Sequence, residues 1–211
     1  MSSFTLKRGL KNIYVAEVLE DSVENFTTGT PEKLIPAGEM GVEVDSDKSE
    51  NWFDDALFAT VGREGGSTVT ISGAGLRAAA IAKLNAKAID EETGAVIDSG
   101  EYTEKYWAVG AEKGNIDGTK ELVWFMKGTF AIPGETAKTK TGDDTDSNGT
   151  ELEYTANKTI HQFTKTQHGC KRVVIDTETT KVKADADWFK QVVTPDNLAT
   201  ICEKVTAAAT T

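Results

Sequence analysis

The segment from Asp144 to Gly149, Asp-Thr-Asp-Ser-Asn-Gly, carries oxygen donors at the spacing that opens an EF-hand calcium loop. Asp144, Asp146 and Asn148 would be ligands 1, 3 and 5, and Gly149 would supply the turn at position 6. The loop then departs from the pattern, because position 12 is Thr155 and not the bidentate glutamate. The flanking segments also have the composition of loop and strand rather than helix. Our prediction is therefore a chain without a metal or other cofactor. Calcium binding at Asp144, Asp146 and Asn148 is the alternative.

The sequence lacks several common catalytic motifs. There is no Gly-x-Ser-x-Gly elbow, no His-Glu-x-x-His motif and no Gly-x-x-x-x-Gly-Lys phosphate loop. His161 falls on an expected strand and His168 in an expected turn. Both positions are typical of histidines that are exposed to solvent or hydrogen-bonded within the fold. The two cysteines, Cys170 and Cys202, are too few for a disulfide framework or a cysteine-based zinc cage. We expect no enzyme, since a hydrolase would rest on the two histidines alone.

Carboxylates instead follow two expected strands, each opposite an apolar face. Alternation of apolar and polar residues with period two is typical of a half-buried strand. The first stretch sets Met40, Val42 and Val44 against Glu39, Glu43 and Asp45. The second sets Leu152, Tyr154, Ala156 and Ile160 against Glu151, Glu153, Thr155 and Asn157. Gathered on one surface, these five carboxylates would form a negative wall that lets polyanions pass without binding them.

Two large aromatic residues, Trp52 and Phe53, lie in the polar segment from Ser46 to Asp55, which we expect to be a loop. Exposed aromatic side chains of this kind often mark a protein–protein contact. The candidate interface residues are therefore Trp52, Phe53, Asp54 and Asp55. The alternative is a loop that folds back on its own domain.

The elements that must position these residues are mainly β-strands. The chain has 28 threonines and 19 glycines but only 4 prolines, which favours many strands joined by glycine and aspartate turns. Further strands are expected at Leu10–Val18, Ser67–Ser72, Glu104–Val109, Glu121–Ile132, Glu151–Phe163 and Val173–Asp176. The stretch Glu121–Ile132 is apolar on both faces and predicts a central strand covered on both sides.

One helix is expected around residues 76–87, because this stretch is rich in alanine and places Leu76, Ala80 and Leu84 on one stripe. A single domain of mainly β structure, a sandwich or partial barrel with this flanking helix, is therefore predicted for residues 1–205. It would carry the long loop at 46–55 and a mobile loop at 136–149. A flexible tail would follow at 206–211.

The excess of acidic over basic residues argues against two kinds of binding partner, nucleic acid and anionic membranes. The 211 residues include 23 Lys and Arg against 34 Asp and Glu, a net charge of −11. Such a chain has no basic footprint for gripping nucleic acid or an anionic membrane. We expect neither a secretory signal at the N-terminus nor a membrane span, since no stretch approaches 18 apolar residues.

Several segments, in this order, resemble the major tail proteins, or tail tube proteins, of long-tailed non-contractile bacteriophages. The resemblance covers roughly Gly9 to Phe163. The matching pieces are Gly9–Ala16, Pro36–Val44 followed by Trp52-Phe53-Asp54-Asp55, Val69–Leu76, Trp124–Pro133 with its Lys-Gly, Phe and closing Pro, and Thr150–Phe163. The sequence departs from the family in the long connection Lys87–Gly100 and in the threonine-rich stretch Thr136–Gly149.

The resemblance implies a structural virion protein made in the host bacterial cytoplasm. Six copies would form a ring, and rings would stack into an acidic conduit for genome delivery. Its implied partners are further copies of itself, other tail proteins such as the tape measure, tail terminator and distal tail proteins, and passing DNA that is not specifically bound. The five carboxylates would line the lumen, and the Ser46–Asp55 loop would join rings. A calcium-stabilised β-sandwich adhesion module is the alternative.

Overall fold

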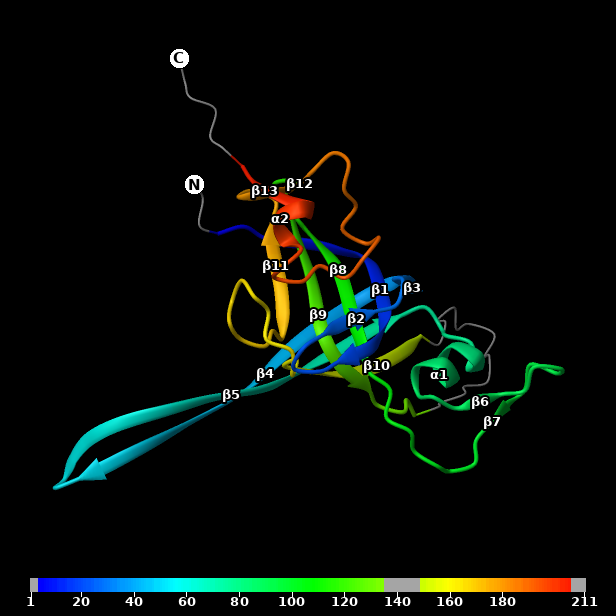
Figure 1. Ribbon diagram of the computed structural model, residues 1–211, viewed down its shortest axis with the longest axis horizontal. Helices are drawn as coiled ribbons and strands as arrows, with labels where there is room; N and C mark the ends of the chain where they lie inside the picture. The colour runs from blue at the N-terminus through cyan, green and yellow to red at the C-terminus, as the bar shows by residue number, and fades with distance from the viewer. Residues whose placement is uncertain (1–3, 135–148, 206–211) are drawn as a thin grey trace, which may run out of the picture.

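The computed structural model describes residues 4–134 and 149–205, and its centre is one large antiparallel sheet (Figure 1). The strand order is β2-β1-β8-β9-β10-β5-β4, with β3 also paired to β1 and β11 also paired to β9. The nine strands of this sheet are β1 Lys7–Asp21, β2 Phe26–Thr28, β3 Glu32–Ile35, β4 Ala37–Phe53, β5 Ala56–Gly73, β8 Trp107–Asn115, β9 Lys120–Phe130, β10 Thr150–Asn157 and β11 Arg172–Asp176. The mainly β prediction is confirmed.

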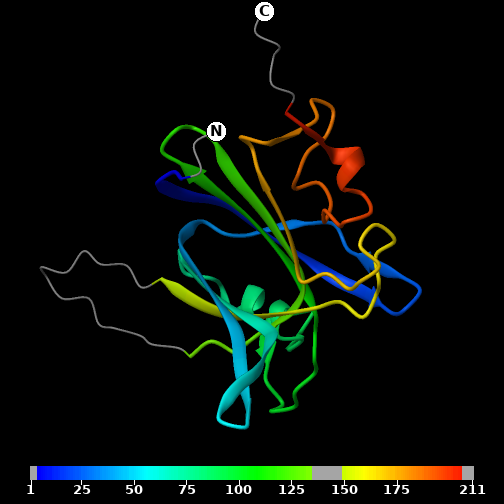
Figure 2. The same ribbon diagram turned by 90° about the vertical axis from the view of Figure 1, so that its left-hand side faces the viewer.

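The sheet folds over on itself, so that β4, β5 and β10 pack across a core from β1, β8 and β9. The buried side chains of this first core come from both halves. They include Ile13, Val15, Val69, Ile71, Val109, Val123, Phe125, Leu152 and Tyr154. Tyr154 is fully buried, and its hydroxyl donates a 2.8 Å hydrogen bond to the carbonyl oxygen of Trp107 on the facing half. This arrangement gives the sandwich-like body in Figure 2.

The strand β9 is covered on both faces, as its two-sided apolar sequence predicts. Its second face forms another core with β8, β11 and the chain after Asp176. Trp124 on β9 is fully buried there, and its indole nitrogen donates a 3.1 Å hydrogen bond to the carbonyl oxygen of Trp188. The C-terminal segment, with β12 Thr180–Val182, α2 Leu198–Ile201 and β13 Cys202–Lys204, therefore belongs to the body.

The expected flanking helix is present as α1, Ala78–Leu84, and it is shorter than the sequence suggests. Leu84 joins the first core, and its carbonyl oxygen accepts a 2.9 Å hydrogen bond from the Trp107 indole. A small hairpin of β6 Ala88–Ile89 and β7 Val96–Ile97 follows. No helix of the described chain is long and apolar enough to cross a membrane.

The expected loop at Ser46–Asp55 is wrong. The chain from 46 to 53 continues β4, pairs with Ala56–Glu64 of β5, and turns at Asp54 and Asp55. The sequence hides this hairpin because no face of it is buried, so the alternation of apolar and polar residues that marks a half-buried strand is missing. Val44 was expected to face the core and is instead 42% exposed, because β4 leaves the body at this point.

Other strand boundaries also differ from the prediction; β5, for example, begins at Ala56 rather than Ser67. The strand β10 ends at Asn157, so Ile160 is not part of its apolar face and is 55% exposed. The strand β8 begins at Trp107 rather than Glu104. The predicted loop at 136–149 lies almost wholly outside the described residues, as do the tail at 206–211 and the calcium candidates Asp144, Asp146 and Asn148.

Candidate functional site

The acidic residues of β4 and β10 lie on one face of the sheet, opposite the first core. Residues paired across β4, β5 and β10 form rows, and the side chains of one row share a face. Three such rows carry the four glutamates: Glu39–Ser72–Glu151, Gly41–Thr70–Glu153 and Glu43–Thr68–Thr155. All four glutamates are exposed, and none forms an ion pair or side-chain hydrogen bond with another described residue. We call this surface, with Asp45, the acidic face.

Asp45 extends the acidic face toward the point where β4 leaves the body. It faces an irregularity in the β4–β5 ladder between Val44 and Ser46, where the partner strand carries Gly65 and Gly66. A side chain at Gly65 would overlap the Asp45 carboxylate, so glycine leaves room for it there. The sequence thus provides space for a fifth carboxylate on this surface.

The opposite side of the same strands fixes the orientation of the carboxylates. Met40 and Val42 of β4 pack on the first core, and Val69, Ile71 and Leu152 are fully buried in it. A one-residue slip in register would move these side chains into water and the glutamates into the core. The hydrophobic core therefore holds the acidic face outward.

The acidic face ends at an open edge. Within the described chain, β4 pairs only with β5 along its 17 residues, so its other side presents backbone N–H and C=O groups without a neighbouring strand. An edge of this length is a template for a strand from another molecule. The arrangement can therefore extend the sheet, and with it the acidic face, from one copy to the next.

The outer part of the β4–β5 hairpin, Ser46–Glu64, projects from the body as an arm (Figure 1). Its strand residues 46–53 span roughly 25 Å at the usual rise per strand residue. Its turn residues Asp54 and Asp55 have φ of 49° and 58°, as a two-residue turn that matches strand twist requires. Lys171 holds its base, with Nζ 2.5 Å from a carboxylate oxygen of Glu64 and 3.1 Å from the carbonyl oxygen of Gly65.

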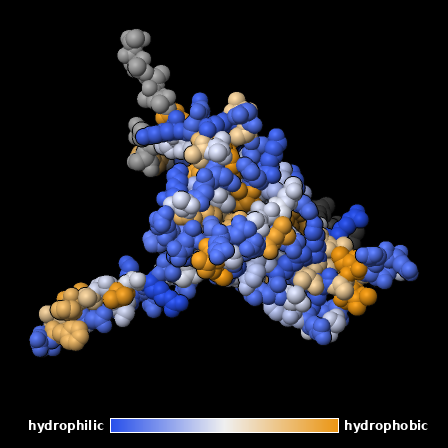
Figure 3. Space-filling view, in the orientation of Figure 1, coloured by the Kyte–Doolittle hydropathy of each residue, from blue (hydrophilic) through white to orange (hydrophobic). Residues whose placement is uncertain are grey.

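Apolar side chains gather at the far end of the arm, as Figure 3 shows. We call Trp52, Phe53, Asp54, Asp55, Leu57 and Phe58 the arm tip. Trp52 is 58% exposed and Phe53 62%, so neither folds back on the body. Phe53 meets Phe58 edge to face at 5.4 Å between ring centres. Sequence analysis missed Leu57 and Phe58, although these apolar residues directly follow the Asp-Asp turn.

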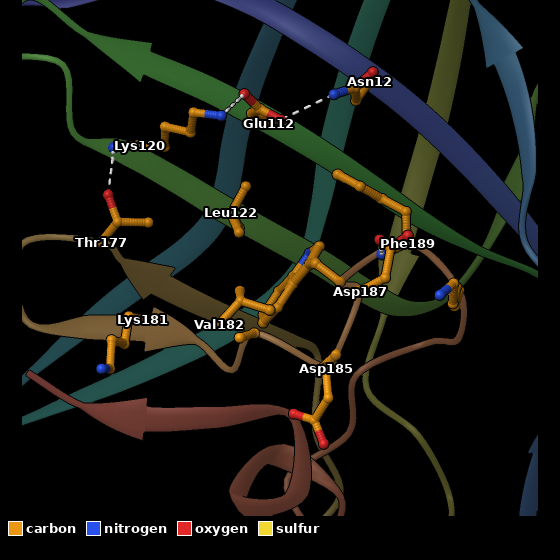
Figure 4. A pocket seen from close by; sticks show the side chains of 14 residues that line it. Asn12, Glu112, Lys120, Leu122, Thr177, Lys181, Val182, Asp185, Asp187 and Phe189 are labelled. Atoms are coloured by element: carbon orange, nitrogen blue, oxygen red, sulfur yellow. Dashed lines mark hydrogen bonds and ion pairs between the residues drawn. The ribbon is translucent and has the colours of Figure 1, made fainter.

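A hollow of about 590 Å³ opens between the second face of the sheet and the C-terminal segment (Figure 4). Leu122, Val182 and Phe189 line it, and its buried carboxylate is Glu112. Burial alone would raise the pKa of Glu112, but hydrogen bonds from Lys120 and Asn12, both at 2.9 Å, lower it overall. Glu112 is therefore held as a paired carboxylate, a structural role rather than that of a proton donor.

Metal-binding and nucleophilic residues do not cluster in the chain at 4–134 and 149–205. No group of three or more His, Cys, Asp and Glu side chains there could hold a metal ion. The His161 ring packs edge-on against Phe163, and the His168 carbonyl oxygen accepts a hydrogen bond from the Phe163 backbone. Cys170 and Cys202 are free thiols.

No protein-family model and no curated protein matches this chain. Two surfaces of the described chain are the functional candidates: the acidic face with its open edge, and the arm with its apolar tip.

Proposed function

We propose that this chain is the repeating subunit of a bacteriophage tail tube, a structural protein without an active site. The single observation that carries the proposal is the acidic face on β4, β5 and β10, which ends at the open edge of β4. Such a sheet, continued from copy to copy, closes into a ring whose inner wall is lined by carboxylates. In the tail tube protein family that the sequence resembles, the expected ring number is six.

An inner wall of this kind suits the passage of DNA. Duplex DNA carries one negative charge per roughly 1.7 Å of its axis. Glu39, Glu43 and Glu153 form no ion pair with a described residue, so their charges face the lumen uncompensated. At physiological salt the repulsion extends over about 8 Å. The genome then slides along the wall and does not bind to it.

Ring closure also explains how the chain tolerates a long open edge. An unpaired strand of 17 residues invites uncontrolled pairing with other chains. Closure of the sheet into a ring would pair the part of this edge that lies in the body, residues 37–45. The arm then extends from each subunit and contacts the next ring through its tip. Other tail proteins at the two ends of the tube are the remaining partners.

Electron microscopy of the purified, concentrated full-length chain tests the proposal. Rings or hollow rods of uniform width are the expected result. Solitary particles at all concentrations, or sheets that never close, would contradict it. A calcium titration followed by thermal melting tests the adhesion alternative, because a ligand held only by the folded state raises the melting temperature. The tube subunit should melt at the same temperature with and without calcium.

A further inference from the structure

We propose that the arm tip of one copy docks on a basic, apolar surface at the start of β1 and the β8–β9 turn of a second copy. This inference rests on the proposed function and names the partner surface of the arm. We call the surface the receiving end. Its residues are Leu6, Lys7, Arg8, Lys11, Lys113, Ile116 and Lys120.

The arm combines apolar and acidic groups. Between Ser46 and Glu64 there are five acidic side chains against two basic ones. Four of the carboxylates, those of Asp47, Glu50, Asp54 and Asp55, form no ion pair with a described residue. Among them lie the exposed rings of Trp52, Phe53 and Phe58, the last 76% exposed. A partner must therefore offer apolar contact and positive charge together.

The receiving end has both properties. Leu6 is 70% exposed and Ile116 58%, and the two are adjacent, because the Ile116 N–H donates a 2.8 Å hydrogen bond to the Leu6 carbonyl oxygen. Five cations lie on the strands that lead to this pair, Lys7, Arg8, Lys11, Lys113 and Lys120, against three carboxylates, Glu112, Asp117 and Glu121. The local balance is therefore +2, in a chain whose net charge is −11.

Part of that positive charge is already used within the chain, and part is not. Glu121 pairs with Lys7 at 2.5 Å and with Lys113 at 2.9 Å, and Glu112 pairs with Lys120 at 2.9 Å. Arg8 and Lys11 are exposed and form no ion pair with a described residue, although the charge of Lys11 helps to lower the pKa of Glu112 on the neighbouring strand. These two cations are therefore the ones that can pair with the carboxylates of an arriving arm.

A hollow of about 200 Å³ lies beside Arg8 and Lys11, between β1 and the β8–β9 turn. Asn115 lines it, is 8% exposed, and donates its amide N–H to Thr119 at 2.8 Å. Its side-chain oxygen is buried and has no hydrogen-bond partner. An unpaired acceptor of this kind favours a ligand that brings a donor. The Trp52 indole N–H, whose contact with Glu50 is a long 3.3 Å, is such a donor.

The two surfaces cannot meet within one molecule. The arm tip and the receiving end lie at separate extremes of the chain in both Figure 1 and Figure 2. Contact between them must therefore join two copies head to tail. A head-to-tail contact leaves one unused arm and one unused receiving end at each stage, so it propagates. Repeated around a ring, it would hold each ring to the next.

Photo-crosslinking of the assembled full-length protein tests this placement. A benzoylphenylalanine in place of Phe58 is expected to react with residues 4–11 or 112–120 of another copy, as mapped by mass spectrometry. The same group in place of Tyr102, which is 65% exposed near the β6–β7 hairpin, is the control and should not label that surface. Crosslinks from position 58 to any other surface would overturn the inference.

Microscopy of the same samples separates this inference from the proposed function. Tubes with crosslinks to other surfaces would contradict only the docking site. Crosslinks at the receiving end without tubes would contradict only the proposed tube function. Samples with neither would overturn both.

Charge reversal gives a second readout: Arg8→Glu with Lys11→Glu should leave rings intact but reduce stacking of the rings at least tenfold. Asp47→Lys with Glu50→Lys in the same chain should restore it, whereas Lys33→Glu with Lys165→Glu should stack normally. Normal stacking of the Arg8 and Lys11 variant would refute the contact.

Discussion

The Asp21 carboxylate lies 2.8 Å from Lys127 Nζ and ties the end of β1 to β9, 106 residues along the chain. The same carboxylate accepts hydrogen bonds from the backbone N–H groups of Ile160 and His161 at about 2.9 Å. Its side chain is only 4% exposed, and Lys127 lies over the Tyr106 ring at 4.2 Å. Burial alone would raise the pKa of Asp21, but these donors outweigh it and lower the pKa overall.

Asp21→Asn should therefore lower the free energy of unfolding by about 3 kcal/mol, because it leaves the Lys127 ammonium buried without its counter-charge. For a chain of this size the melting temperature should fall by roughly 6 to 12 °C. Asp185→Asn is the matched control, since Asp185 is exposed and outside any ion pair with a described residue, and it should melt normally. Equal melting of the two variants would contradict the role of Asp21.

The lowered pKa of Asp21 also predicts how stability depends on pH. A carboxyl group with a lower pKa in the folded state stabilises the fold above its unfolded pKa, about 3.9 for aspartate. That contribution is lost as the pH falls through the folded value. Between pH 7 and pH 3 the wild-type chain should lose more unfolding free energy than Asp21→Asn, as measured by urea denaturation. Parallel pH profiles would show that Asp21 makes no such contribution.

Gly128 of β9, which pairs with Ala156 of β10, should not tolerate a side chain. A Cβ there would overlap the Thr155 carbonyl oxygen and the Tyr154 ring, which is fixed by its hydrogen bond to Trp107. Gly128→Ala should destabilise the fold by about 3 kcal/mol, as overpacking of a close contact does. Gly62→Ala on the arm is the control, because a Cβ there would meet nothing within 4 Å, and its melting temperature should not fall.

The parts of this fold that the sequence predicts are those with a buried face. The alternation at Glu39–Glu43 and Glu151–Glu153 gives the correct strands and the correct exposed side, because the apolar half of each pattern enters the first core. The apolar run in β9 likewise indicates a strand covered on both faces. The two acidic strands, β4 and β10, lie on either side of β5. This neighbourhood depends on pairing between segments far apart in the chain, so no local sequence pattern predicts it.

The arm shows where sequence analysis fails. Its strands are exposed on both sides, so the residues from Ser46 to Phe53 carry no periodic apolar signal. The Asp54-Asp55 turn requires two positive φ angles, for which Asn-Gly or Asp-Gly is the usual sequence. The receiving end was missed for another reason: Arg8 and Ile116 are far apart in sequence, and the β1–β8 pairing brings their segments together.

Removal of the aromatic rings at the arm tip should separate folding from assembly. Trp52 and Phe53 contact no core residue, so Trp52→Ala with Phe53→Ala should melt within about 1 °C of the wild-type chain. Assembly into stacked rings should decrease strongly, because central aromatic residues dominate the energy of protein interfaces. Sedimentation gives the assembled fraction. Tyr102→Ala is the exposed aromatic control, and tubes from the double variant in normal yield would refute the anchoring role.

Reversal of charge on the acidic face should turn a wall that repels DNA into one that retains it. In the variant Glu39→Lys, Glu43→Lys and Asp45→Lys, each replaced carboxylate becomes a cation on the exposed side of β4, so the first core is untouched and assembly should proceed. Assembled tubes of this variant should co-sediment with a short labelled DNA duplex at low salt. Retention should weaken steeply with added salt, because each phosphate contact releases a condensed counterion.

The control for this experiment carries the same change in net charge at another place. Glu91, Glu92 and Glu101 are exposed around the β6–β7 hairpin, away from the acidic face, and their replacement by lysine should leave DNA in the supernatant. Equal retention by both variants would mean that net charge alone governs the effect, and no retention by either would mean that the acidic face does not line the channel. Only retention confined to the first variant agrees with carboxylates of β4 that face the passing genome.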